Sequence, residues 1–65
     1  MEWFIQHTSP QGRQHAFVTL ARSAADAQAR AERIHGQAMA CVCLCLSRMS
    51  PAQRAAYERR AAAAA

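Results

Sequence analysis

The sequence predicts an α+β domain built on a three-stranded antiparallel sheet, in the order strand, strand, helix, strand, helix. Three observations support this fold class. Two strand-like runs flank a short turn, two later segments open with helix-capping residues, and the run 37–47 is apolar at both of its alternating sets of positions. A strand that is apolar on both faces requires cover on both faces, so the third strand is expected to lie inside the fold or inside an assembly.

The first two strands are expected to form a hairpin. Residues 2–8 and 14–20 are rich in aromatic and β-branched side chains, which favour strands. Between them, Pro10 fixes one backbone dihedral and Gly12 tolerates a positive one, as a turn requires. A loop over 9–13 would pair His7 with His15, Ile5 with Phe17, Trp3 with Thr19, and Phe4 with Val18.

The first helix is expected to begin after Ser23 and to end at Gly36. Ser23 stands three residues before Asp26, which is the spacing of an N-terminal cap, and glycine commonly follows a helix. The side chains on one stripe are mostly small: Ala24, Ala27, Ala31 and Ile34. We expect this helix to cover the sheet face formed by Phe4, Val18, Leu20, Val42 and Leu44.

The second helix is expected to begin at Pro51, with Ser50 as its cap and Gln53 closing a capping box. It would run past Tyr57 into the terminal alanines, which are expected to fray. The chain then divides into a core over residues 1–48 and a C-terminal helix with an alanine tail over 49–65. A right-handed crossover between the second and third strands gives the spatial order 2-1-3.

Size and composition restrict the function. The chain has 65 residues, of which 52% are hydrophobic, but many of these are alanines that bury little area. The large apolar side chains suffice for one thin core, so we expect neither enzymatic activity nor a cofactor. No signal peptide follows Met1, and the apolar run 38–46 is roughly half as long as a membrane span. A cytoplasmic protein with reduced cysteines and no membrane contact is therefore expected.

Cys41, Cys43 and Cys45 alternate along the third strand. Such cysteines are roughly 6 to 7 Å apart at the backbone, which is too far for a relaxed disulfide and awkward for a zinc tetrahedron. We therefore predict no metal site and interpret the thiols as small packing residues, with a thiol contact between subunits as the alternative. His7 and His15 are interpreted as exposed strand-end residues without a catalytic role.

The sheet face opposite the first helix gives the strongest functional indication. Exposed apolar surface rimmed by polar residues marks protein interfaces, and the second helix has only Tyr57 as a large apolar side chain with which to cover this face. We expect a homodimer or a bound partner there, with closure by Tyr57 as the alternative. The predicted dimer face consists of Ile5, Met39, Cys41 and Cys43.

Partner-binding residues are predicted among aromatic and arginine side chains, because these dominate interface energetics. They are Trp3, Phe17, Tyr57, Arg54, Arg59 and Arg60. The net charge is +4, and every Lys or Arg position is an arginine. The densest basic cluster consists of Arg54, Arg59 and Arg60, together with Arg48. Two interpretations of this cluster remain open: phosphate contacts to a nucleic acid, or a solvated helix face with an Arg54–Glu58 pair.

The segment 17–27 and the order strand, strand, helix, strand resemble small proteins of phages and mobile elements, including some anti-CRISPR proteins. The resemblance covers Glu2 to Ser47 and includes an Ala-x-Ser-x-x-x-Ala pattern at Ala21, Ser23 and Ala27. It implies a non-catalytic inhibitor that blocks a host protein or ribonucleoprotein complex in the host cytoplasm. Many such inhibitors are acidic mimics of nucleic acid, and this basic chain departs from that pattern. The alternative function is a basic nucleic-acid-binding accessory protein.

Overall fold

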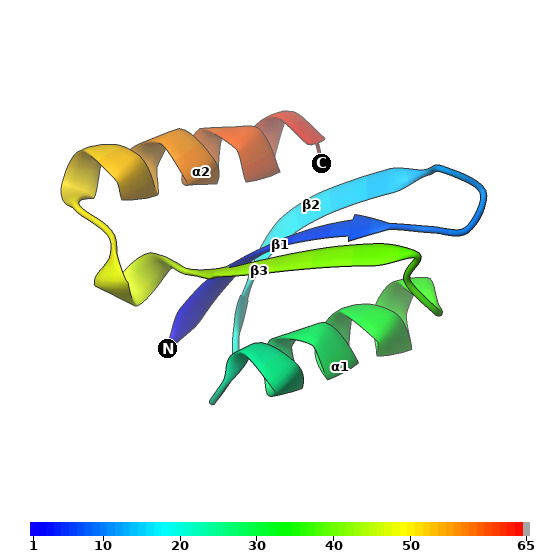
Figure 1. Ribbon diagram of the computed structural model, residues 1–65. Helices are drawn as coiled ribbons and strands as arrows, with labels where there is room; N and C mark the ends of the chain where they lie inside the picture. The colour runs from blue at the N-terminus through cyan, green and yellow to red at the C-terminus, as the bar shows by residue number, and fades with distance from the viewer. Residues whose placement is uncertain (65) are drawn as a thin grey trace.

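The computed structural model describes residues 1–64, and its elements follow the predicted order (Figure 1). The strands are β1 (Glu2–Thr8), β2 (Gln14–Leu20) and β3 (Ala40–Cys45), and the helices are α1 (Ala24–His35), the short 3-10 helix η1 (Leu46–Arg48) and α2 (Pro51–Ala64). Ala65, the end of the predicted alanine tail, lies outside the described residues. The sheet order β2-β1-β3, with antiparallel neighbours, confirms the predicted α+β fold.

The β1–β2 hairpin has the predicted register. The four predicted pairs are Trp3 with Thr19, Phe4 with Val18, Ile5 with Phe17, and His7 with His15, and all four are observed. In the turn, the Ser9 N–H donates to the Arg13 carbonyl oxygen, and the Gly12 N–H donates to that of Ser9. Gly12 has a φ of 82°, a left-handed conformation that favours glycine. The turn residues therefore fix the register of the hairpin.

Both helices begin at the predicted caps. The Asp26 N–H donates to Ser23 Oγ at 3.1 Å, and Gly36, with a φ of 86°, ends α1. At the start of α2, the Gln53 N–H donates to Ser50 Oγ while the Ser50 N–H donates to Gln53 Oε1. This reciprocal pair is a capping box, and it satisfies backbone donors that a helix start leaves without partners.

The predicted location of α1 on the sheet is wrong. The helix packs on the opposite face, where its Ala27 and Ala31 are buried together with Trp3 and Ile5. The small thiols of β3 line this face and allow an alanine stripe to approach closely. The other face of β1 carries the polar side chain of Gln6, for which a stripe of alanines has no hydrogen-bonding group.

The face that was assigned to α1 is covered by α2 instead (Figure 1). The Tyr57 ring packs on that of Phe4 with a centroid distance of 4.9 Å, and Phe4 is only 1% exposed. Leu46, in η1, is buried as well. Although α2 follows the residues that were predicted to form the core, it packs as part of the same folded body.

The two helices are displaced toward opposite edges of the sheet. α1 packs on β1 and β3, whereas α2 packs mainly on β2 and also on β1 (Figure 1). The α2 side of β3 is consequently left largely uncovered, and Val42 at its middle is 47% exposed. Exposed apolar side chains also occur elsewhere, at Leu20, Ile34 and Met39.

Replacing Ile5 with alanine should destabilise the fold by about 2–5 kcal/mol, because the side chain has no exposed surface and its removal leaves a cavity. Ile34→Ala is the matched control. Ile34 is 67% exposed, so its loss should change the free energy of unfolding by less than about 1 kcal/mol. Urea unfolding followed by circular dichroism measures both values.

If Ile5→Ala leaves too little folded protein to measure, Ile5→Val is used in its place. Its free energy of unfolding should be lower than that of the wild type by about 0.5–1.5 kcal/mol. Equal losses at positions 5 and 34 would contradict this description of the core.

Candidate binding surface

Three side chains on α2 contact three alternate side chains on β1. Residues three apart on a helix and two apart on a strand each share one face, so the two rows lie against each other. An ion pair of partly exposed groups contributes only about 0–1 kcal/mol. The central contact, between two aromatic rings, is therefore the main stabilising one, and the polar contacts on either side of it fix the helix orientation. The contacts are Arg54 with Glu2, Tyr57 with Phe4, and Arg60 with Gln6.

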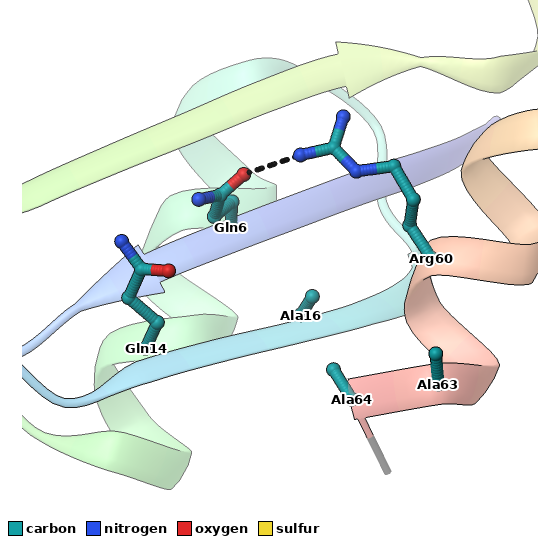
Figure 2. A pocket seen from close by; sticks show the side chains of 6 residues that line it. All are labelled: Gln6, Gln14, Ala16, Arg60, Ala63 and Ala64. Atoms are coloured by element: carbon teal, nitrogen blue, oxygen red, sulfur yellow. Dashed lines mark hydrogen bonds between the residues drawn. The ribbon is translucent and has the colours of Figure 1, made fainter.

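Arg60 ends this row at the boundary of the uncovered sheet. Its Nη2 donates to Gln6 Oε1 at 3.1 Å, and Figure 2 shows the guanidinium directed toward that amide. The Arg60 Cζ lies 5.4 Å from the Phe4 ring centroid and 5.2 Å from that of Tyr57, within the range of cation–π attraction. A guanidinium has five N–H donors, so this one is held in position and retains donors for a ligand.

A shallow depression lies beside Arg60 (Figure 2). Its polar groups are two amides and one guanidinium, which hydrogen-bond to carboxylates and to peptide groups. These groups have the chemistry of a binding site. The volume of the depression is about 430 Å³, and it is lined by Gln6, Gln14, Ala16, Arg60, Ala63 and Ala64.

Next to Arg60, strand β3 presents an unprotected edge. The strand pairs with β1 on one side only, in continuous register, and it contains neither a charged residue nor proline. Charges, prolines and bulges are the usual devices that keep an edge strand from pairing with another chain. Val42 pairs with Gln6. Leu44, the next residue of β3 on the same face of the sheet, is half-buried. We call Gln6, Val42, Leu44 and Arg60, with the outer edge of β3, the β3 surface.

The predicted partner-binding residues lie on two sides of the sheet and do not form one surface. Trp3 is 9% exposed beneath α1, and its Nε1 donates to the Ala21 carbonyl oxygen at 3.1 Å. Phe17 is half-buried on the same side and packs against the core. The other four belong to α2 across the sheet: Tyr57, Arg54, Arg59 and Arg60.

The arginines of the basic cluster differ in their contacts. Arg54 forms ion pairs with Glu2 and Glu58, and these carboxylates together with their hydrogen bonds raise its pKa. Arg60 is bonded within the chain as described, whereas Arg48 and Arg59 are exposed. The predicted Arg54–Glu58 pair is therefore observed, and the cluster is in part a structural device that holds α2 to β1.

The predicted dimer face lies beneath α1. Ile5 has no exposed surface, Cys41 and Cys43 are half-buried against the core, and Met39 is 66% exposed. The expectation that this face is uncovered is wrong, because α1 packs on it. A second copy that contacted Ile5 would have to displace α1.

The three thiols form a row between β3 and α1. Cys41 Sγ and Cys43 Sγ are 3.8 Å apart, compared with about 2.0 Å in a disulfide. Burial raises the pKa of Cys43 to about 11, and the hydrogen bond between the Cys43 and Cys41 thiols is the second cause. Cys45 Sγ lies 3.9 Å from Met1 Sδ. Within residues 1–64, no three histidine, cysteine or acidic side chains are arranged to hold a metal ion.

Cys43 should react slowly with iodoacetamide in the folded protein. With its pKa raised from 9.0 to about 11, the reactive thiolate is roughly a hundredfold less abundant at pH 8, and the rate should increase as the pH approaches 11. Peptide mapping by tandem mass spectrometry of native and urea-unfolded protein compares the two rates. A native rate within about threefold of the unfolded rate would contradict the assigned burial.

His7 and His15 face each other across the hairpin, as the register predicts. The prediction that both are exposed is wrong for His7, which has no exposed surface. A third histidine, His35 from the end of α1, stacks on the His15 ring at a centroid distance of 4.0 Å. The sequence gives no signal for this approach, because it depends on how the crossover returns to the sheet.

Comparison with family models, with curated proteins and with solved structures found no match to this chain. Its function is therefore argued from its residues. In residues 1–64, no helix combines the length and the apolar character that crossing a membrane requires.

Proposed function

We propose that this chain is a non-enzymatic binding protein that docks on a partner protein through the β3 surface. The observation that carries the proposal is the uncharged edge of β3, which lies beside an exposed valine and a positioned arginine. An extended segment of the partner would pair with β3 and lengthen the sheet by one strand. In this mode of recognition, main-chain hydrogen bonds supply affinity and alternate side chains supply specificity.

The chemistry of the surface favours a segment that carries both apolar and acidic residues. Val42 and Leu44 offer apolar contacts to side chains on the same face of the added strand. Arg60 offers donors in the fork geometry that suits a carboxylate, and the net charge of +4 attracts acidic segments over basic ones.

The finer form of the proposal follows the resemblance to anti-CRISPR proteins. In that form the partner is a host protein or ribonucleoprotein complex, and docking blocks its activity. Strand addition suits a small inhibitor because backbone groups of a single strand supply much of the binding. The nucleic-acid alternative receives less support, since Glu2 and Glu58 already pair with Arg54 of the basic cluster.

Selection of a random-peptide display library on the immobilised protein tests the proposal. We expect enriched peptides with alternating apolar residues and at least one Asp or Glu. Val42→Glu should lower their affinity by about tenfold or more, because it places a negative charge on the β3 surface. Ile34→Glu is the matched control, since Ile34 is also exposed but lies on α1, and it should leave the affinity unchanged.

Two results would overturn the proposal. One is a selection that enriches no peptide, and the other is an enriched peptide that binds Val42→Glu as tightly as it binds the wild-type protein. Measuring affinity over a series of salt concentrations distinguishes the proposal from the nucleic-acid alternative. Binding at the β3 surface should weaken modestly with ionic strength, because salt screens the charge contacts of Arg60 but not the main-chain and apolar contacts. An affinity for a single-stranded oligonucleotide that falls steeply between about 50 and 200 mM salt would instead favour phosphate contacts.

A further inference from the structure

Three histidines from three different elements meet at one end of the sheet. His7 lies on β1, His15 on β2 and His35 in the last turn of α1. The rings of His15 and His35 are nearly parallel, with an interplanar angle of 9° and centroids 4.0 Å apart. The His7 ring lies 5.4 Å from that of His35 and 6.0 Å from that of His15. This histidine cluster joins the C-terminal end of α1 to the hairpin.

The hydrogen bond of the His7 side chain defines which ring nitrogen carries the proton. Its Nε2 lies 2.9 Å from the Gly36 carbonyl oxygen, which only accepts, so Nε2 carries the proton and donates. Its Nδ1 is buried and has no hydrogen-bond partner among residues 1–64. A second proton on Nδ1 would create a buried donor without an acceptor, together with a charge removed from water. The Gly36 contact therefore requires the proton on Nε2.

Within residues 1–64, no carboxylate lies close enough to a ring of the cluster to form an ion pair with it. Burial, followed by the neighbouring rings of His15 and His7, lowers the pKa of His35 below 6.5. The charged groups around the cluster are Arg13 from the hairpin loop, and Glu32 and Arg33 on the same helix as His35. The uncharged groups are Phe17 on β2, Cys41 on β3, Ser9 and Gln11 from the hairpin loop, and Ala61 and Ala64 from α2.

We propose that the histidine cluster is a pH-sensitive latch that holds the end of α1 and the following loop to the hairpin. At neutral pH the stacked neutral rings and the His7–Gly36 hydrogen bond keep the latch closed. Protonation of His35 places a charge against the imidazoles of His15 and His7, and the contact loosens. Gly36 leads through residues 37–39 into β3, so the loosening reaches the start of that strand.

The direction of the pH dependence follows from linkage. Because the pKa of His35 is lower in the folded chain than in the unfolded one, the unfolded chain binds more protons when the pH falls below about 6.5. The contribution of His35 to stability is therefore complete above that pH and is lost as the pH falls through the folded-state pKa.

An NMR titration of the imidazole signals, combined with thermal unfolding between pH 5 and 8, tests the latch. We expect His35 to titrate below pH 6.5 and the midpoint of unfolding to fall by several degrees from pH 7.5 to 5.5. His35→Phe keeps a ring against His15 but cannot be protonated, so most of this fall should disappear. Arg33→Gln, an exposed change in the same helical turn, should retain the wild-type pH dependence.

A second readout separates the latch from global unfolding. At pH 5.5, amides 33–39 should lose protection from hydrogen exchange while those of β1 keep it, after correction for the intrinsic exchange rates. Three results would overturn the proposal: titration of His35 at or above pH 6.5, the full wild-type fall in His35→Phe, or a uniform loss of protection along the chain. If His35→Phe does not fold, the titration and the exchange of the wild-type protein decide.

Discussion

The burial of β1 on both of its faces is the constraint on which the rest of the structure depends. Trp3, Ile5 and His7 lie beneath α1, and Phe4 lies beneath α2. The two faces differ in kind, because one carries Trp3 and Ile5 next to each other while the other places Phe4 between the polar side chains of Glu2 and Gln6. An alanine stripe covers the first by close approach, and a row of arginine, tyrosine and arginine covers the second. Each helix is therefore matched to its face, although neither has a large apolar side of its own.

The displacement of the two helices connects this core to the proposed function. α1 covers the β1–β3 half of one face and α2 the β1–β2 half of the other, so the α2 side of β3 stays open. Arg60 lies at this boundary because its contacts with Gln6 and Phe4 hold it there. The histidine cluster lies where the chain enters β3, so the same strand is the proposed binding edge and the neighbour of the proposed latch.

Local signals in the sequence are sufficient to predict the strands and helices, their order along the chain and the register of the hairpin. The turn at Gly12 and the caps at Ser23 and Ser50 act over a few residues, and the structure confirms each of them. The predicted location of α1 is wrong, because alternation along a strand fixes which residues share a face but not which helix covers it. A usable signal was present: Gln6 and Glu2 require polar partners, and only α2 has arginines at matching spacing. The approach of His35 to the hairpin depends on the tertiary path of the crossover, which no local pattern determines.

Native-state hydrogen exchange of the dilute protein at neutral pH tests the central claim, that β1 is enclosed while the edge of β3 is free. In a central antiparallel strand every amide pairs with one neighbour or the other, so the amides of residues 3–8 in β1 should exchange slowly. On β3 only every second amide pairs with β1, so protection should alternate along 40–45. Slow exchange at every amide of β3 would show that its edge is already paired, and it would contradict the account.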